Sequence, residues 1–228
     1  MGTIAENLKS VREKIEAACL RVGRNPAEIT LVAVTKTVSA ERINEAIQAG
    51  VTHIGENRVQ EAREKYSQIK PVTWHLIGHL QTNKVKHALK IFQWIHSVDS
   101  FHLAEKIERE ASRLDKMIPV FLEVKTSSEE TKYGVPVSET LELVKRISGF
   151  DHLQVRGLMT IAPFTDDEKT IRKSFRTLRH LQSEINQAEI KGVKMEHLSM
   201  GMSHDFEIAI EEGATMVRVG TAIFGSRN

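Results

Sequence analysis

The sequence predicts a single-domain α/β protein folded as a (β/α)8 TIM barrel. Three observations support this prediction: short apolar segments alternate with amphipathic helical segments, the alternation occurs eight times, and 228 residues suit a compact barrel. An open, doubly wound sheet is the alternative, since boundary errors of two to four residues could hide or add a strand. No repeat or linker divides the chain, so we expect one domain over residues 1–228, with 1–25 as a helix packed on the barrel.

The elements follow in a regular order. Apolar residues recur at spacings of three and four from Ile4 to Val22, which predicts a helix, and Gly23 and Pro26 then end it. Eight short segments rich in β-branched residues come next, as expected for strands buried on both faces. We expect these strands at 31–36, 53–56, 73–78, 94–98, 119–125, 155–160, 197–200 and 216–220. A helical pattern follows each of the first seven, one of them starting at Ser203, and a polar loop at 126–136 follows the fifth strand.

Composition excludes several classes of protein. Lys and Arg total 32 and Asp and Glu total 30, without runs of like charge, which argues against a nucleic-acid partner. The single cysteine, Cys19, cannot form an internal disulfide, which indicates a reducing compartment. No apolar stretch approaches the roughly 20 residues of a membrane span, and the N-terminus lacks a secretory signal. We therefore expect a cytoplasmic protein that does not bind membranes.

Barrels of this type carry their sites where strands end, and Lys36 ends the first predicted strand. It shares a strand face with Val32 and Val34, so its amine would emerge from an apolar wall. Burial disfavours the charged form, and a neutral amine can form a Schiff base with a carbonyl compound. The alternative is a lysine whose stem packs while its ammonium group reaches water.

The last two strand ends predict an anion site. Glycines in the segments 199–203 and 220–222 allow backbone N–H groups to approach a phosphate, and these loops are the usual phosphate site of the fold. Arg218, just before Gly220, could bind the phosphate, face a ring nitrogen, or form an ion pair with Glu123 or Glu56. An amine and a phosphate site together indicate a phosphorylated carbonyl compound. The residues alone leave open a sugar phosphate, as in Schiff-base aldolases, and pyridoxal 5′-phosphate (PLP).

The ten histidines do not indicate a metal centre. His75 and His79 are four residues apart, but they lie on a strand and its end and would not converge on one ion. No carboxylate–histidine cluster has ligand spacing, so we expect no metal.

Six segments, in order, resemble the YggS/PROSC family of pyridoxal-phosphate homeostasis proteins. They are AVTK at 33–36, GENRVQE at 55–61, WHLIGHLQTNK at 74–84, GLM at 157–159, LSMGMS at 198–203 and VRVGTAIFG at 217–225. The resemblance implies a barrel like the N-terminal domain of alanine racemase. It implies that PLP is carried as a Schiff base on Lys36 and serves intracellular PLP homeostasis, with PLP-dependent apoenzymes as candidate recipients. The implied contacts are a pocket wall at Asn57, phosphate contacts from Ser199, Gly220 and Thr221, a turn shaped by Gly201, and Arg218 beside the pyridine nitrogen.

Two departures from the family pattern stand out. Lys125 replaces a common asparagine and, with Lys84, is a candidate for a secondary PLP adduct; the chain also stops at Asn228, where many relatives continue. Alanine racemases of this type use a second domain that supplies a tyrosine base, and only three residues follow Gly225 here. We therefore expect a monomer without assigned catalytic residues or strong catalytic activity. A weak PLP-dependent amino-acid racemase and a Schiff-base aldolase acting on a sugar phosphate are the alternatives.

Overall fold

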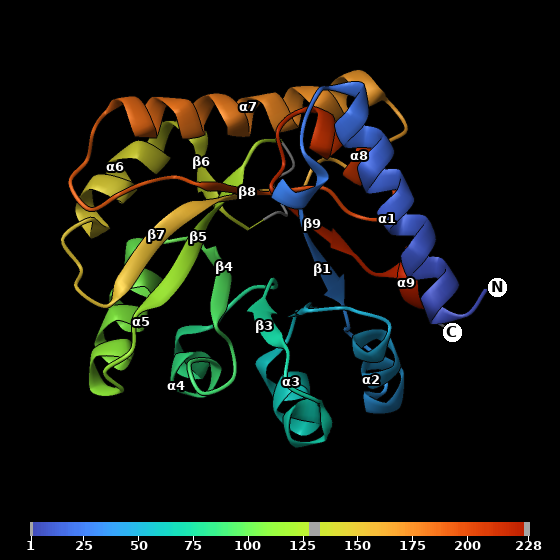
Figure 1. Cartoon of the computed structure of the whole chain (residues 1–228). Helices are drawn as coiled ribbons and strands as arrows, with labels where there is room; N and C mark the ends of the chain where they lie inside the picture. The colour runs from blue at the N-terminus through green and yellow to red at the C-terminus, as the bar shows by residue number, and fades with distance from the viewer. Residues whose placement is uncertain (1, 128–132, 226–228) are drawn as a thin grey trace.

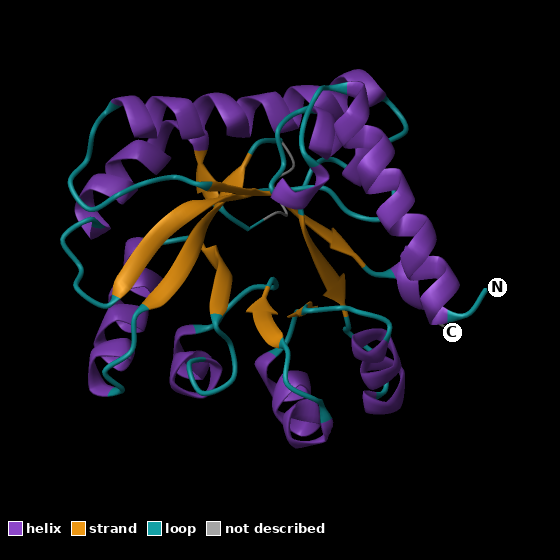
Figure 2. Cartoon of the chain, in the orientation of Figure 1, coloured by secondary structure: helices purple, strands orange, loops and turns teal. Residues whose placement is uncertain are grey.

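The computed structural model describes residues 2–127 and 133–225, and its centre is a closed barrel of parallel strands (Figures 1 and 2). Hydrogen bonds join β4 to β5 and β9 to β1, which closes the ring and confirms the predicted barrel over the open sheet. The barrel strands are β1 (Thr30–Val34), β2 (His53–Glu56), β3 (Thr73–Leu76), β4 (Trp94–Val98), β5 (Ile118–Lys125), β7 (Leu153–Met159), β8 (His197–Ser199) and β9 (Met216–Val219).

Helices cover the outside of the barrel (Figure 2). They are α1 (Ile4–Arg21), α2 (Ala40–Gln48), α3 (Val59–Lys65), α4 (Val85–Ala88), α5 (Phe101–Arg113), α6 (Val137–Ile147), α7 (Glu168–Gln187), α8 (Phe206–Glu211) and α9 (Thr221–Phe224), with single 3-10 turns at Pro26–Glu28, Tyr66–Gln68 and Thr82–Lys84. Thr3 and Glu6 form a reciprocal capping box that starts α1. The Asn7 side chain then donates to the carbonyl oxygen of Ile223, which ties α1 to α9.

Several element boundaries differ by one or two residues from the sequence prediction, and three differences near the strand ends bear on the candidate site. β1 ends at Val34 instead of residue 36, because the chain turns at Thr37, whose φ is +60°. The helix predicted from Ser203 begins at Phe206, because the N–H groups at 205 and 206 first close a turn onto the carbonyl of Met202. The loop after β5 contains a short strand, β6 (Val135–Pro136), paired with the end of β5.

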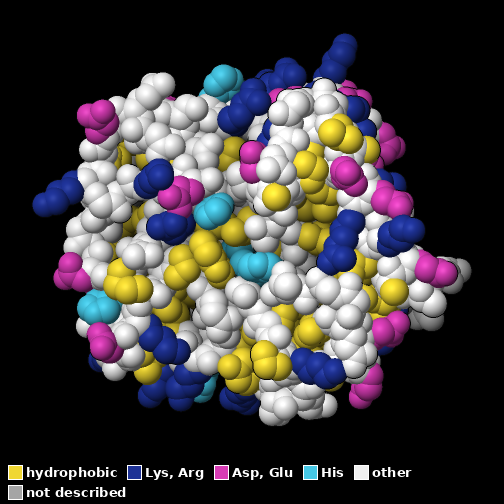
Figure 3. All heavy atoms as spheres, in the orientation of Figure 1, with side chains coloured by type: hydrophobic (Ala, Val, Ile, Leu, Met, Phe, Trp, Pro, Cys, Tyr) yellow, Lys and Arg dark blue, Asp and Glu magenta, His cyan; other side chains and the backbone are white. Residues whose placement is uncertain are grey.

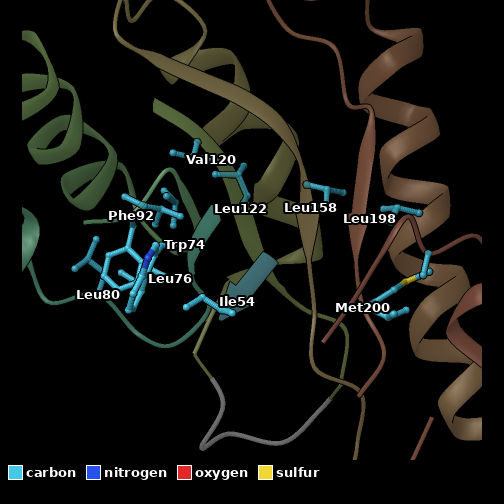
Figure 4. Close-up of a cluster of buried hydrophobic side chains, with 14 of the residues drawn as sticks. Ile54, Trp74, Leu76, Leu80, Phe92, Val120, Leu122, Leu158, Leu198 and Met200 are labelled. Atoms are coloured by element: carbon cyan, nitrogen blue, oxygen red, sulfur yellow. The ribbon is translucent and has the colours of Figure 1, made fainter. Parts of the chain in front are cut away.

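The apolar core lies mainly between the barrel and its helices. Figure 4 shows outward-facing side chains of this layer, among them Ile54, Leu122, Leu158 and Leu198. A smaller cluster of Phe121, Met159 and Met216, flanked by Trp94, fills the barrel interior. Figure 3 shows a histidine side chain near the middle of one face, between hydrophobic side chains, with charges of both signs around the edge.

Candidate functional site

Lys36 lies at the barrel mouth, in the turn that follows β1, and is half-buried. The sequence analysis placed Lys36 at the end of the first strand; this is wrong by two residues, because β1 already ends at Val34. Ala33 of β1 pairs with Val219 of β9, so the segments that leave these two strands emerge side by side. Lys36 consequently shares one edge of the barrel with the loop that begins at Gly220.

Side chains of α3 hold the turn around Lys36. Thr37 adopts a left-handed conformation, which is uncommon for a β-branched residue, and its N–H donates to Glu61 Oε1 at 2.5 Å. Lys65 Nζ donates to the carbonyl oxygen of Thr35 at 2.9 Å and to the same Glu61 oxygen at 2.6 Å. Thr35 and Thr37, which flank Lys36, are thus held in place by hydrogen bonds to side chains of α3.

Glu56 belongs to this supporting network on the outer side of the barrel. It is fully buried and accepts hydrogen bonds from Thr35 Oγ1 at 2.7 Å and Lys65 Nζ at 3.1 Å. Burial raises the pKa of its carboxyl group, while these two donors oppose the rise. Lys65, and not Arg218, is therefore the ionic partner of Glu56.

The loop after β8 and the start of α9, directly after β9, form a cradle of hydrogen-bonding groups. Ser203 Oγ accepts N–H groups from Gly220 at 3.2 Å and Ala222 at 3.4 Å. Gly201 turns the first loop with φ +92°, and a Cβ there would lie 2.6 Å from the Cβ of Ala209. Two N–H groups and a hydroxyl that converge between glycines form a site suited to an anion.

Ser199 lies deeper than the cradle and is fully buried. Its Oγ accepts from Arg218 Nη1 at 2.7 Å and lies 2.9 Å from His96 Nδ1. Ser203, and not Ser199, therefore bonds the N–H groups of the cradle, and the exposed Thr221 is the first residue of α9, directly after Gly220. In the sequence, Ser203 lies on the other side of Gly201 from Ser199, and this position could have indicated that its hydroxyl belongs to the cradle.

Arg218 is a buried cation in the barrel interior. Its guanidinium donates to Ser199 Oγ and, through Nη2, to the carbonyl oxygen of Thr160 at 2.8 Å. Burial lowers its pKa to about 10, and the carboxylates of Asp205 and Glu123 oppose the shift, so Arg218 stays charged at neutral pH. Within residues 2–127 and 133–225, no carboxylate forms an ion pair with it.

Glu123 is a titratable group that the sequence analysis considered only as an ion-pair partner. Burial raises its pKa to about 7; the charge of Asp99 adds to the rise and that of Arg218 opposes it. Glu123 lines a cavity of about 170 Å³ together with Lys125 and Tyr133. Side chains two residues apart on a strand point to the same face, and Glu123 lies two residues before Lys125. This spacing could have indicated that the carboxyl group of Glu123 points to the same side as Lys125.

Asn57 and Lys84 line a larger cavity, of about 690 Å³, at the ends of β2 and β3. His79 and Tyr133 also line it, with their rings stacked at a centroid distance of 4.1 Å. Gly78 packs against the backbone of Asn57, where a Cβ would lie 2.4 Å from the Asn57 carbonyl oxygen. The predicted wall residue therefore stands beside a polar, positively charged recess.

The described residues contain no group of three or more histidine, cysteine, aspartate or glutamate side chains able to hold a metal ion. None of the described helices combines the length and apolarity that crossing a membrane requires.

The chain matches the family model described as alanine racemase, N-terminal domain, over residues 2–228. A pyridoxal phosphate homeostasis protein of Aquifex aeolicus is 44% identical over 97% of both chains. The chain belongs to the family of pyridoxal phosphate homeostasis proteins. Another member, from Escherichia coli, is 38% identical over 100% of this chain and 98% of its own. The resemblance inferred from the six segments is therefore confirmed.

Solved structures agree with this family membership. PipY of Synechococcus elongatus, solved with PLP bound, superposes with a TM-score of 0.88 at 38% identity, covering 98% of this chain and all of PipY. An alanine racemase of Clostridium difficile gives a TM-score of 0.77 at 15% identity, and the match covers 57% of that enzyme. The second similarity concerns the barrel fold alone.

Proposed function

We propose that this member of the family binds PLP at the barrel mouth, holds it covalently on Lys36, and serves PLP homeostasis inside the cell. The observation that supports the proposal is the pairing of β1 with β9, because the turn of Lys36 then lies beside Gly220 and the start of α9 at Thr221. Membership of the family and the PLP-bound structure of PipY support the same ligand.

The residues present fit the chemistry of PLP. Two N–H groups and the hydroxyl of Ser203 suit a phosphate, and the amine of Lys36 suits an aldehyde. The buried cation of Arg218 suits the pyridine nitrogen, because a neighbouring positive charge keeps that nitrogen unprotonated. When bound, PLP supplies an electrophilic aldehyde and an electron-withdrawing ring.

The proposal extends to how the protein works in the cell. The chain acts as a monomer in a reducing, cytoplasmic environment and passes PLP to PLP-dependent apoenzymes. Its only cysteine, Cys19, is buried in α1, which agrees with a protein that forms no disulfide.

Borohydride reduction followed by peptide mapping tests the proposal. The purified protein incubated with PLP should absorb as a Schiff base and retain one pyridoxyl group on Lys36 after reduction. Lys36→Ala should lose this group and retain weaker, phosphate-dependent binding, whereas Lys84→Ala and Lys125→Ala should keep it on Lys36. Reduction that traps no pyridoxyl group on Lys36 would refute the proposal.

The same preparation separates the two alternatives. An aldolase would be colourless and would be inactivated by borohydride only in the presence of a sugar phosphate. A racemase would exchange the α-proton of an amino acid in deuterated water. A PLP homeostasis protein without strong catalytic activity should show neither substrate-dependent inactivation by borohydride nor exchange of the α-proton.

A further inference from the structure

Three histidines form a continuous row of hydrogen bonds through the barrel interior. His53 Nδ1 lies 2.9 Å from His75 Nε2, and His75 Nδ1 lies 2.9 Å from His96 Nε2. His96 Nδ1 lies 2.9 Å from Ser199 Oγ, which accepts from Arg218 at 2.7 Å. The row therefore runs from the first residue of β2 to the buried cation of the candidate site.

The middle of the row is excluded from water. His75 and His96 are fully buried, and the ring of His75 stacks on Trp94 at a centroid distance of 5.9 Å. Burial lowers the pKa of His75 to about 3 and that of His96 well below the ordinary value, with Arg218 and His197 adding positive charge near His96. Both rings are therefore neutral at physiological pH, and each carries one N–H proton.

The other end of the row reaches a cavity. His53 is half-buried and lines a space of about 410 Å³, which Arg12 and Glu16 of α1 also line. These two side chains and His75 are the titratable groups that face His53 there. A proton can thus be exchanged with solvent at His53, far from the loops that form the cradle.

The hydrogen bonds of the row can run in two directions, which we call its two orders, because each neutral histidine has one N–H donor and one nitrogen acceptor. In the first, the Ser199 hydroxyl donates to His96 Nδ1, and each histidine donates from Nε2 toward the next, so that His53 presents Nε2–H to the cavity. In the second, each histidine donates from Nδ1 in the reverse direction, and His96 donates to Ser199. Each N···N contact holds one proton in either order.

The surroundings of Ser199 favour the first order. In the first order, the Ser199 hydroxyl proton is donated to His96 Nδ1, and the lone pairs of Ser199 Oγ are free to accept from Arg218. In the second order this oxygen receives two donors, and its proton needs a further acceptor, which the described part of the chain does not provide. A buried donor without an acceptor is unfavourable.

We infer that His53, His75 and His96 are positioning residues whose hydrogen-bond order holds Ser199 as the acceptor for Arg218, and that protonation of His53 reverses this order. Relative to the first order, the row holds one additional proton, taken up from solvent, and donor and acceptor are exchanged in each of the three contacts. Ser199 keeps a hydroxyl proton, His75 and His96 each end with Nδ1–H, and the additional proton resides on His53. The coupling along the row does not need the cofactor, whereas its effect on bound PLP rests on the proposed function.

Histidine tautomers measured by ¹⁵N NMR on the full chain, without cofactor, provide the first test. His75 and His96 should both carry their proton on Nε2. Opposite tautomers in these two rings would place two protons or none in their shared contact, and would overturn the inference.

A double-mutant cycle provides the second test. Ser199→Ala removes the hydroxyl that sets the order, so the titration midpoint of His53 should move to higher pH. In a His75→Phe background, which keeps an aromatic ring beside Trp94, the same change should leave the His53 midpoint where it was. An equal shift in both backgrounds would show that the row does not carry the coupling.

His197 offers a matched control, because it is also half-buried, begins a barrel strand, and bonds Thr215 instead of the row. His197→Phe should leave the coupling between Ser199 and His53 intact. With PLP bound, His53→Phe should shift the absorbance maximum more than His197→Phe does. Equal spectra would refute the link to Arg218, whereas failure of the unaltered protein to take up PLP would count against the proposed function only.

Discussion

Lys65 Nζ lies 2.9 Å from the carbonyl oxygen of Thr35, so a side chain of α3 is bonded to the residue immediately before Lys36. The same ammonium group contacts Glu61 and the fully buried Glu56. The conformation of the turn that carries Lys36 therefore depends on an ionic network behind the barrel wall.

Lys65→Met should destabilise the protein by about 3 kcal/mol, because it leaves the carboxyl of Glu56 buried without its cation. Urea unfolding measures this loss. Adding Glu56→Gln removes the unpaired carboxylate and should restore part of the stability. A double variant no more stable than Lys65→Met would show that the Glu56–Lys65 pair does not support the turn.

Gly201→Ala should destabilise the fold by about 2–4 kcal/mol, since it combines a left-handed backbone with a Cβ 2.6 Å from that of Ala209. Gly149 is the matched control: a Cβ there meets no atom within 4 Å, so Gly149→Ala should change stability by less than about 0.5 kcal/mol. Thermal unfolding of both variants checks the prediction. Equal stabilities would mean that the turn after β8 adapts to a side chain.

Glu123→Gln should change the pH dependence of stability. The folded pKa of Glu123, about 7, lies above its ordinary value of 4.5, so the folded state holds a proton that the unfolded chain has lost. Wild-type stability should therefore fall as the pH rises from 4.5 to 7, by at most roughly 3 kcal/mol from this group. Urea unfolding across this range should show a flatter profile for Glu123→Gln. Glu142→Gln, an exposed change on α6, should retain the wild-type profile.

Ser203→Ala should weaken PLP binding roughly tenfold, the effect expected when a hydrogen bond to a charged group is lost. Binding of pyridoxal, which lacks the phosphate, should change little. Absorbance titrations with both ligands measure the difference. The assignment of Ser203 to the phosphate would be wrong if the two affinities fell equally.

The barrel was predictable because its signals are local. Each strand is a short apolar segment, and eight of them in alternation with helices leave few other topologies. The end of β1 was not predictable, because the turn at Thr37 depends on a bond to Glu61, which belongs to another element. Sequence patterns describe periodicity well and such tertiary contacts poorly.

The site was predictable to a similar degree. The strand-end rule located Lys36 and the cradle loops, and family resemblance assigned their roles. The sequence could not distinguish Ser199 from Ser203, since the two serines lie only four positions apart, and only the structure shows that Ser199 ends β8 fully buried while Ser203 meets the cradle. The row from His53 to His96 was also missed, because contacts between neighbouring strands depend on register and barrel curvature.

The neighbouring positions of β1 and β9 have a consequence for the order of events during synthesis (Figure 1). Lys36 is translated before the cradle, which is completed only by β9 and the residues that follow it. A growing chain on the ribosome therefore carries the amine without the groups that would retain an anionic ester. Under the proposed function, capture of the ligand therefore requires β9 to have been synthesised and paired with β1.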